Sequence, residues 1–343
     1  MKLRFATNEE ISNWNAIIIE NPDGGNILQG KEFAEQKELA GWTVRYIMSD
    51  TSAFTVLEKT IPLLGKVWYC PKGPAVNSSE ELQKLLTELT VFARLQGVFS
   101  IKIEPELDHS IDLSHLGLIK TKPVQYNFAT VLIDLTPSLD DILSGLNQKG
   151  RHAIRRAERD GVSAKAVAPT VENYAIMYSL FLETASGAGF TIRPPEYYRE
   201  FYDRYSANGN GQLFFAYFED KVVAGAFAMV QGSKSMYKDG ASVRDRTAYG
   251  ASHLLQWEII RWAKEKGSKQ HDLAGVPPKT EIKNADHPFY GLGRFKTSFN
   301  KTVTEYVGAY DVPVRPLKAK LWHRFFEKVV RRLHFKKHHE SYY

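Results

Sequence analysis

The residues of this 343-residue chain that could do chemistry are mostly cations, and they gather in three short segments. In the first, NQKGRHAIRRAERDG, Arg151, Arg155 and Arg159 lie four residues apart and therefore share one face of a helix. Such a face suits the phosphates of a nucleic acid. An ordinary solvated helix face is the alternative interpretation.

The other two segments combine cations with aromatic residues and turns. In GAGFTIRPPEY, Arg193 stands just before two prolines that are expected to begin a helix. A helix N-terminus and an arginine together suit an anion, although a capped helix with a surface arginine explains the same residues. In GLGRFKTSF, Arg294 and Lys296 flank Phe295. This combination suits nucleotide stacking and phosphate contact, whereas the two glycines alone are weak evidence.

No residue stands out as a covalent nucleophile or a metal ligand. Cys70, the only cysteine, lies in an apolar run and indicates a packed structural thiol. The ten histidines occur without HExxH or a comparable spacing, so we expect no metal site. Glu104 could accept a proton from a reacting amine, or it could be purely structural.

The elements that would position these residues form two similar series. Strand-like runs at 42–48, 53–58 and 63–70 precede a helix at 79–96 and a buried strand at 98–103. The second series has strands at 213–218, 222–231 and 235–238, a helix at 250–266 and a strand at 269–274, offset by roughly 170 residues. This order suits two tandem α/β domains with mixed sheets and a cleft between them. The alternative is that the similar order of elements in the two series is a coincidence.

Between the two series, helices are expected at 138–161, 170–186 and from Pro194 to 205. Residues 315–343 form a basic amphipathic helix with one apolar stripe. That stripe is expected to pack on the first domain, and a helix lying at an anionic lipid surface is the alternative.

Composition narrows the function classes. The chain is 43% hydrophobic and 24% charged, as in globular proteins. No apolar run reaches the roughly 18 residues that span a bilayer, and no signal peptide is apparent, so we expect a cytoplasmic protein. The net charge is +6, and the last 29 residues alone hold nine basic and two acidic side chains. Such a patch attracts phosphate polyanions or anionic lipid.

As an ordered set, these segments resemble the Fem family of bacterial aminoacyltransferases, which build the interpeptide bridge of peptidoglycan. Besides the three cationic segments, the matching motifs are LQGKEFAEQK at 28–37, PKGPAV at 71–76 and HDLAGV at 271–276. The resemblance runs from about residue 10 to 312.

The resemblance implies an α/β fold of two tandem GNAT-like domains, 1–145 and 146–314, with the helix 315–343 on the first. The interval 193–212 is too short to hold the coiled-coil arm of some members. The implied donor is aminoacyl-tRNA. The implied acceptor is the stem peptide of a precursor, either lipid-linked (lipid II) or UDP-MurNAc-pentapeptide. No cofactor is implied, and we expect a monomer that can contact an anionic membrane.

Site residues follow from the matched motifs. Lys37, Arg193 and Tyr197 would hold the diphosphate end of the acceptor, and Tyr237 and Asp239 would complete the acceptor site.

The transfer centre would be formed by Lys296 with Phe295 beside it, at the tRNA acceptor end. Glu104 falls where relatives carry an acidic residue, and its role as a base stays open. The implied tRNA-binding residues are Lys149, Arg151, Arg155 and Arg294.

Three positions depart from the family pattern. Phe33 replaces a frequent tryptophan, Ala274 a frequent glycine, and Asp239 a tyrosine of some relatives. The fold implied is unaffected, but the exact acceptor and the transferred amino acid stay open.

The implied reaction is aminolysis of an ester, which requires positioning and oxyanion stabilisation but no covalent enzyme intermediate. An acyl-CoA-dependent GNAT acyltransferase is one alternative; it requires a glycine-rich phosphate loop before the 250–266 helix, where DRTAYGAS has one glycine. A non-catalytic protein that binds RNA or a membrane surface through its tail is another. Aminoacyl transfer to a protein N-terminus or a lipid head group is a third.

Overall fold

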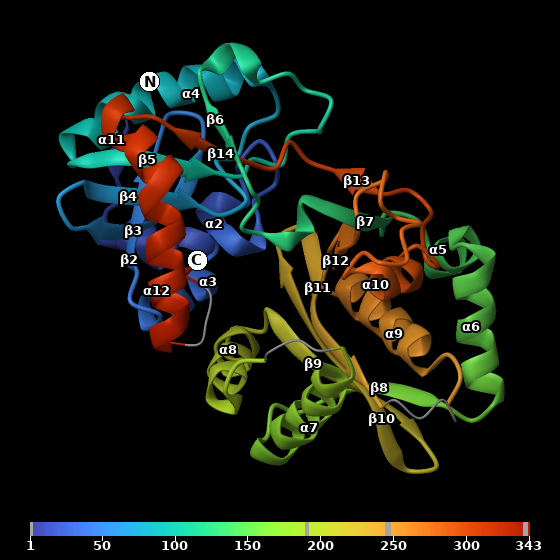
Figure 1. The fold of residues 1–343 in the computed structure, drawn as a ribbon. Coiled ribbons are helices and arrows are strands. Elements are labelled where there is room, and N and C mark those ends of the chain that lie inside the picture. The colour runs from blue at the N-terminus through green and yellow to red at the C-terminus, as the bar shows by residue number, and fades with distance from the viewer. Residues whose placement is uncertain (1–2, 189–191, 244–247, 339–341) are drawn as a thin grey trace. The chain divides into compact units, whose positions relative to one another are not determined.

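The computed structural model describes residues 3–188, 192–243, 248–338 and 342–343, and it divides into two compact units. The first unit combines Met1–Phe128 with Glu305–Tyr343, and the second is Ala129–Thr304. Each unit is built on a mixed sheet of seven strands with helices packed against it (Figure 1). No helix of the described residues is both long and apolar enough to cross a membrane.

The sheet of the first unit has the strand order β1-β2-β3-β4-β5-β14-β6. All neighbours are antiparallel except β4 and β5, which are parallel and joined by α4. The strands are β1 (Arg4–Phe5), β2 (Thr43–Met48), β3 (Ala53–Ile61), β4 (Gly65–Cys70), β5 (Val98–Ile103), β6 (Ile119–Thr121) and β14 (Ala309–Val312). The helices are α1 (Asn8–Ser12), α2 (Trp14–Ile18), α3 (Lys31–Leu39), α4 (Ser79–Leu95), α11 (Pro316–Leu321) and α12 (Glu327–His338), with short 3₁₀ turns η1 (Ile27–Gln29), η2 (Ser114–Leu116) and η3 (Tyr126–Phe128) and a π turn, η4 (Trp322–Phe326), between α11 and α12.

The sheet of the second unit has the order β13-β7-β12-β11-β10-β9-β8. Its one described parallel pair, β11 and β12, is joined by α9. The strands are β7 (Ala129–Asp134), β8 (Ser163–Val167), β9 (Gly211–Phe218), β10 (Lys221–Gln231), β11 (Lys234–Ser242), β12 (Gln270–Gly275) and β13 (Thr304–Glu305). The helices are α5 (Leu139–Gly145), α6 (Gln148–Arg159), α7 (Val171–Ala188), α8 (Pro195–Ala207), α9 (Ala251–Glu265) and α10 (Tyr290–Lys296).

The two predicted series are confirmed as matching halves. In each sheet, three antiparallel strands are followed by a crossover helix and a parallel strand, β2-β3-β4-α4-β5 and β9-β10-β11-α9-β12. These elements begin and end at local sequence signals such as capping residues and glycines. α4, for example, starts where the Ser78 hydroxyl accepts a hydrogen bond from the Glu81 amide, and the chain leaves it at Gly97 with a φ of 79°.

The units differ from the expected domains at both boundaries. β7, expected in the first domain, pairs with β12 and belongs to the second unit. β14, expected in the second domain, pairs with β5 and β6 and belongs to the first. Both strands pair with residues far away along the chain, and local patterning carries no record of such pairing.

The helix expected at 138–161 is two helices. α5 and α6 are separated at Leu146 and Asn147, whose ψ angles of 151° and 138° are extended. The break lets the Asn147 and Gly150 amides bond to Phe299 and Ser298 carbonyls, so tertiary contacts override helix propensity here.

Helices cover both faces of the second sheet (Figure 1). Because neighbouring residues of a strand point to opposite faces, Phe214 of β9 packs on Trp262 of α9. On β10, Phe227 points the other way and stacks on Tyr202 of α8, with ring centroids 4.1 Å apart.

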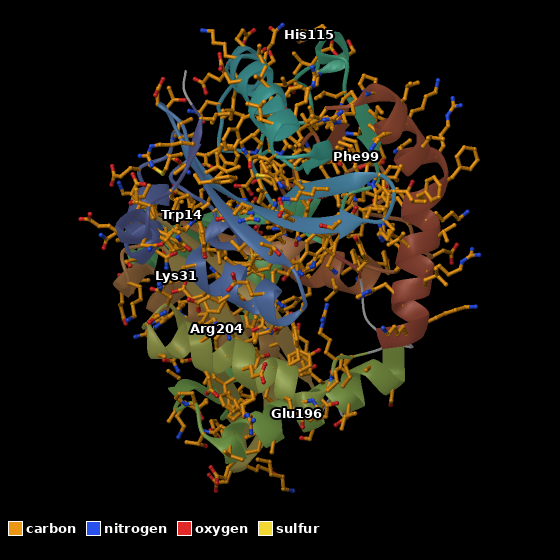
Figure 2. The ribbon with its side chains drawn as sticks, turned by 90° about the vertical axis from the view of Figure 1, so that its left-hand side faces the viewer. Trp14, Lys31, Phe99, His115, Glu196 and Arg204 are labelled. Carbon is orange, nitrogen blue, oxygen red and sulfur yellow. The ribbon has the colours of Figure 1, made fainter. Side chains whose placement is uncertain are left out.

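Two buried aromatic residues of the first unit, Trp14 and Phe99, are labelled in Figure 2. Trp14 is fully buried, and its indole N–H donates to the Gln29 carbonyl and the Thr55 hydroxyl, both at 3.0 Å. Phe99 of β5 is also fully buried and packs edge-on against Trp322 of the C-terminal helix, with centroids 5.9 Å apart.

The apolar stripe of the C-terminal helix was expected to pack on the first domain, and only part of it does so. Of the stripe, Trp322 is buried and Val330 is partly buried against the core. Six members of the expected stripe are exposed instead: Leu317, Leu321, Phe325, Phe326, Val329 and Leu333.

Candidate functional site

Lys296, the last residue of α10, is a buried cation in the second unit. Its Nζ donates to the Gly275 carbonyl at 2.9 Å, and the Tyr237 ring centroid lies 5.8 Å away. Burial lowers the pKa of Lys296 to about 8, and the negative charge of Asp272 partly opposes this shift. At pH 7 the side chain is therefore still mostly an ammonium, with one of its three donors committed to Gly275 among the described residues.

The end of β12 is folded to receive this lysine. Ala274 has a φ of 62°, in the left-handed region that disfavours residues with a Cβ. Asp272 Oδ1 accepts a hydrogen bond from the Ala274 amide at 2.6 Å and another from the Thr130 hydroxyl. The left-handed turn gives the physical reason for the glycine that the family motif often has at this position.

Phe295 lies beside Lys296 on the same helix and packs on His253 of α9, with ring centroids 4.9 Å apart. His253 also stacks on Phe299 and shares a hydrogen bond of 3.0 Å with the Ser298 hydroxyl. Burial, with a smaller contribution from Lys149, lowers the pKa of His253 to about 4, so the ring is neutral at pH 7. His253 could not be predicted from local patterning, because its partners come from a segment more than 40 residues away.

Arg193 and Tyr197 are brought together as expected for residues beside a helix start. The guanidinium lies over the Tyr197 ring, 4.3 Å from its centroid, and α8 begins two residues after Arg193. The Arg193 amide donates to the Tyr198 hydroxyl at 3.4 Å, and the Tyr178 hydroxyl donates to the Arg193 carbonyl at 3.3 Å. Residues 189–191 of the same motif lie outside the described residues.

Tyr237 and Asp239 lie at an irregular point of β11. The register with β10 shifts between Phe227 and Ala228, which pair with Asp239 and Tyr237 and leave Lys238 as the extra residue. Asp239 accepts hydrogen bonds from the Tyr202 hydroxyl and from Lys238 Nζ, both at 3.1 Å. Such bulges commonly redirect side chains beside binding sites.

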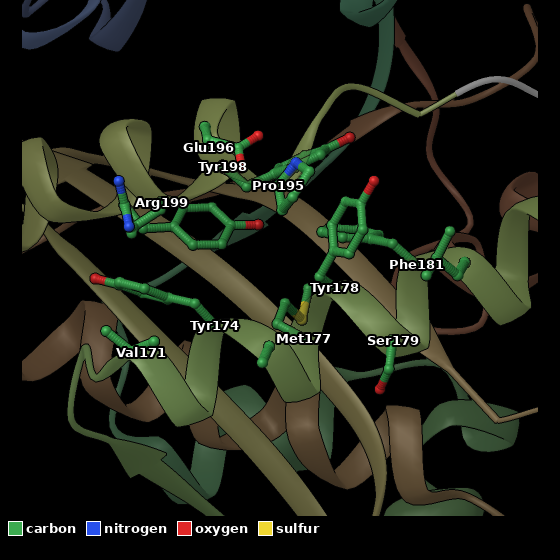
Figure 3. A pocket seen from close by; sticks show the side chains of 13 residues that line it. Val171, Tyr174, Met177, Tyr178, Ser179, Phe181, Pro195, Glu196, Tyr198 and Arg199 are labelled. Carbon is green, nitrogen blue, oxygen red and sulfur yellow. The ribbon is translucent and has the colours of Figure 1, made fainter.

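A pocket of about 370 Å³ lies between α7 and α8, and five of its thirteen lining residues are aromatic (Figure 3). Because Tyr178 and Tyr198 also bond to the backbone of Arg193, the pocket adjoins that arginine. Its lining includes Tyr174, Met177, Tyr178, Phe181, Tyr198 and Tyr202.

The cationic helix α6 is less open than its spacing suggested. Lys149 and Arg155 are exposed, as is Arg294 on α10. Arg151, however, is half-buried and donates to the carbonyls of Ser144 and of Leu146, the latter at 2.8 Å. Its guanidinium thus holds the end of α5, a bond that helical spacing alone cannot reveal.

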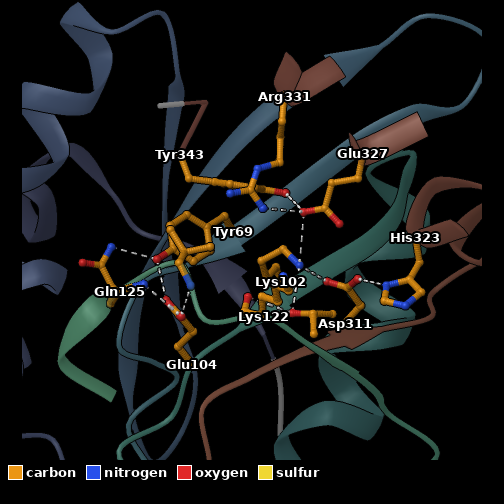
Figure 4. Close-up of polar contacts among 12 residues, drawn as sticks. Tyr69, Lys102, Glu104, Lys122, Gln125, Asp311, His323, Glu327, Arg331 and Tyr343 are labelled. Atoms are coloured by element: carbon orange, nitrogen blue, oxygen red, sulfur yellow. Dashed lines mark hydrogen bonds and ion pairs between the residues drawn. The ribbon is translucent and has the colours of Figure 1, made fainter. Parts of the chain in front are cut away.

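Two predicted residues, Lys37 and Glu104, belong to the first unit. Lys37 is half-buried on α3, with its Nζ 5.3 Å from the Phe33 ring centroid. Glu104 is buried and accepts hydrogen bonds from the Tyr69 hydroxyl and the Val124 amide at 2.6 Å, and from the Gln125 amide at 3.1 Å (Figure 4). Burial raises the pKa of Glu104 against these bonds.

A second buried polar cluster lies where β14 meets α12 (Figure 4). Asp311, His323 and Glu327 place one ligand atom each within 4.8 Å of one another, as a metal site would. Lys102 Nζ, however, lies 2.7 Å from Asp311 and 3.4 Å from Glu327. This ammonium supplies the positive charge that the two carboxylates require.

Sequence reasoning also missed Lys72, in the PKGPAV motif. Its side chain is buried, donates to the Asn127 carbonyl at 2.9 Å and lies 3.5 Å from Glu106. A lysine in a turn between a strand and a helix is ordinarily exposed, so its residue type does not predict burial. Only its place in the PKGPAV motif could have singled out Lys72.

Cys70 is fully buried in β4, and burial raises the pKa of its thiol far above the ordinary range. It is the packed thiol that the sequence indicated, which excludes it as a thiolate nucleophile.

Comparison with known proteins gives consistent relatives. Lipid II:glycine glycyltransferases of Staphylococcus haemolyticus, Staphylococcus epidermidis and Staphylococcus aureus are 24%, 23% and 22% identical to this chain. These alignments cover 89%, 93% and 91% of this chain, and 91%, 94% and 92% of the relatives. The first spans 392 positions, so that relative carries segments that this chain of 343 residues lacks.

Solved structures agree on the fold. A crystal structure of FemX superposes with a TM-score of 0.79 at 21% identity, over 95% of this chain and all of that one. The C-terminal domain of a putative lysylphosphatidylglycerol synthetase from Agrobacterium fabrum gives 0.54 at 16% identity, over 96% and 98%. The expected class, tandem GNAT-like α/β units, is confirmed, and the described residues contain no long helical arm.

Family assignment rests on a match to the FemAB family over residues 109–219 and 210–328, which together span more than half of the chain. The match includes α6, α8, β12 and the Lys296 site. The chain therefore belongs to the FemAB family.

Proposed function

We propose that this protein transfers an amino acid from an aminoacyl-tRNA to the stem peptide of a peptidoglycan precursor and so forms the interpeptide bridge. The observation that carries the proposal is its family membership, together with relatives named lipid II:glycine glycyltransferase that align over nearly their whole length. The acceptor that these relatives are named for, lipid II, favours a lipid-linked precursor over a soluble one for this chain too.

The reaction proceeds by attack of the stem-peptide amine on the carbonyl carbon of the aminoacyl ester. A C–N bond forms, the bond to the tRNA 3′ oxygen breaks, and the amine proton ends on the leaving oxygen. The Lys296 ammonium, held by Gly275, stabilises the negative charge that develops on the carbonyl oxygen or on the neighbouring tRNA phosphate. Phe295 beside it offers a surface for the terminal base.

Glu104 has a structural role in this proposal. Its two oxygens accept three hydrogen bonds, and two of the donors are backbone amides of the segment that leads into the second unit. Such a carboxylate holds the connecting chain in place. The proton of the attacking amine then passes to a group of the substrates.

The proposed binding roles are those that the family motifs imply. Arg193, whose guanidinium lies over the Tyr197 ring, holds the diphosphate of the acceptor, and Tyr237 and Asp239 contact the rest of it. Lys37, on α3 of the first unit, stays a predicted contact of the acceptor. Exposed cations contact tRNA phosphates, and Arg151 supports them by bonding to the end of α5. The exposed tRNA-binding residues are Lys149, Arg155 and Arg294.

The acyl-CoA alternative has less support. A pyrophosphate would sit at the start of α9, but Gly250 there faces Ala153 of α6 so closely that a Cβ would lie 2.4 Å from its carbonyl oxygen. Residues 244–247 of the preceding segment lie outside the described residues. A monomer working in the cytoplasm, where charged tRNA is found, fits the proposed substrates.

The test is to incubate the protein with a panel of charged tRNAs and with lipid-linked and UDP-linked muramyl-pentapeptides. Mass spectrometry then measures the molecular masses of the products. One pair should give a mass gain equal to one or more amino acid residues. Absence of any gain, with a folded protein and intact charged tRNA, would refute the proposal.

A further inference from the structure

The C-terminal helix, residues 316–338, exposes two parallel rows of side chains. One row is apolar and the other is basic, and each repeats every four residues, which places its members along one ridge of the helix. The apolar row is Leu317, Leu321, Phe325, Val329 and Leu333. The basic row is Lys320, Arg324, Lys328, Arg332 and Lys336.

The opposite side of this helix is fixed on the first unit. Trp322 packs on Phe99, and Glu327 accepts a hydrogen bond from Tyr343 at 2.8 Å and lies 3.4 Å from Lys102. Trp322 and Glu327 are five residues apart, and the π turn between them brings both to the inner side. The two rows therefore cannot turn inward without losing these buried contacts.

The apolar row is unusually open for a globular protein. Its side chains are between 45% and 81% exposed, and Phe326 and Phe335 add further exposed rings at 45% and 53%. Contiguous exposed apolar surface of this kind marks an interaction site. None of the five basic-row side chains forms an ion pair with any residue that the structure describes.

We infer that these two rows are a membrane-contact surface, on which the helix lies in the plane of an anionic lipid bilayer. The apolar row would enter the boundary between head groups and acyl chains, while the basic row contacts the anionic head groups. An anionic bilayer offers an apolar partner to one row and negative charge to the other. The charge balance of residues 315–343, nine basic and two acidic side chains, favours the same partner.

The chemistry of the two rows argues against a second copy of this chain or a nucleic acid as the partner of this surface. Two copies of this chain meeting through the surface would bring two basic rows together, and like charges repel. A nucleic acid would satisfy the basic row but would leave Phe325 and Leu333 exposed to water. Only a surface that is both anionic and apolar matches both rows.

Vesicle co-sedimentation tests the inference directly. The protein should bind phosphatidylcholine vesicles that contain phosphatidylglycerol and should not bind pure phosphatidylcholine. Lys328→Gln with Arg332→Gln should weaken binding about thirtyfold, since each basic residue near an anionic surface contributes roughly a fivefold factor. Leu321→Ser with Phe325→Ser should weaken it at least about tenfold.

Matched controls lie elsewhere on the first unit. Val91 and Leu95 are 59% and 79% exposed, so Val91→Ser with Leu95→Ser removes similar apolar surface elsewhere and should leave binding unchanged. Lys84→Gln with Lys122→Gln is the corresponding control for charge. If wild-type protein ignores anionic vesicles, or if the row variants bind as wild type does, the inference is wrong.

Depth in the bilayer gives a second readout. Because Cys70 is buried, the variant Val329→Cys can be labelled selectively at position 329 with an environment-sensitive dye. The dye emission should shift to the blue on anionic vesicles, while a dye at Leu95→Cys should not shift. Equal behaviour at the two positions, or loss of charged-tRNA binding in the row variants without loss of vesicle binding, would overturn the assignment.

The link to lipid-linked acceptors rests on the proposed function, whereas vesicle binding does not. If transfer occurs, the row variants should keep full turnover with UDP-linked acceptor and lose it only with the lipid-linked acceptor in vesicles. Vesicle binding without any transfer would instead support this surface and refute the proposed function.

Discussion

Lys296 carries the chemical argument, because it is a buried cation whose charge the fold both maintains and directs. A lysine held at the Gly275 carbonyl can face a developing oxyanion without reorganising, which is where such groups contribute most. If this is its role, removing the ammonium should slow turnover while the protein remains folded.

Lys296→Met is therefore expected to lower kcat by about a hundredfold to a thousandfold. The control is Lys301→Met, an exposed lysine a few residues away, which should keep wild-type rates. Steady-state kinetics with charged tRNA and precursor would measure both. Full activity of Lys296→Met would remove it from the transfer centre.

The pH profile should report the same group. The pKa of Lys296 is lowered to about 8, so its positive charge is present at pH 7 and is lost as pH rises through about 8. Transfer rates, corrected for spontaneous ester hydrolysis, should fall above that pH. A rate that keeps rising to pH 9.5 would show that the ammonium is not required.

Glu104 gives a prediction about stability rather than rate. In Glu104→Gln, an amide group replaces one of the oxygens that accept from Tyr69, Val124 and Gln125, so one donor loses its partner. We expect a loss of about 1–3 kcal/mol in the free energy of unfolding, with kcat reduced less than tenfold. Tyr69→Phe removes a donor to the same carboxylate and should also destabilise.

Denaturant unfolding and single-turnover kinetics, run on both variants, separate the two roles of Glu104. A general base would cost Glu104→Gln about a hundredfold or more in rate with little effect on stability. That pattern, with Tyr69→Phe unaffected in rate, would contradict the structural role.

At the scale of elements, β12 shows how local strain positions the site. Ala274 occupies a left-handed conformation that costs a residue with a Cβ about 1–2 kcal/mol. The strain persists because Asp272 and Thr130 fix the turn that presents Gly275 to Lys296. The hydrogen bonds of Asp272 and Thr130 thus hold this turn in a conformation that Ala274 alone would disfavour.

Ala274→Gly should consequently raise the free energy of unfolding by up to about 1 kcal/mol, after the entropy cost of glycine is counted. Ala175→Gly, at an exposed position inside α7, should lower it by about 1 kcal/mol. Chemical denaturation of the two variants measures the difference in sign. Destabilisation by both substitutions would show that the left-handed turn is not strained.

Elements with strong local signals were predictable. The alternating and buried runs of β3, β10 and β12 and the capped, amphipathic α4 were found within a few residues of their observed ends. The break between α5 and α6 was not found, since it depends on bonds to Phe299 and Ser298 that no local pattern records. The same reason hid the contacts of Arg151 and His253.

At the scale of the molecule, the chain is interleaved. It leaves the first unit at residue 128, builds the second and returns at residue 305 to supply β14 and the C-terminal helix. The paired halves could be predicted from their repeated order of elements. The exchange of β7 and β14 could not, because strand pairing at such separations is set by tertiary structure alone.

This interleaving predicts how fragments behave. Residues 129–304 contain six whole strands of the second sheet, β7 to β12, and should fold alone with a cooperative transition, seen by calorimetry and by dispersed amide resonances. Residues 1–128 lack β14, which pairs with both β5 and β6, and should not fold. Joining 305–343 to 1–128 through a flexible linker should restore folding, and a cooperative 1–128 fragment would contradict the account.

The central claim is that the acyl group comes from a charged tRNA. The most direct measurement supplies a labelled aminoacyl-tRNA and a muramyl-pentapeptide precursor to the purified protein, with or without prior digestion of the tRNA by ribonuclease, and counts label in the precursor. Label should appear with intact tRNA, disappear after digestion, and fall by about a hundredfold or more in Lys296→Met. Transfer that survives digestion, or that proceeds from an acyl-CoA in place of the tRNA, would contradict the account.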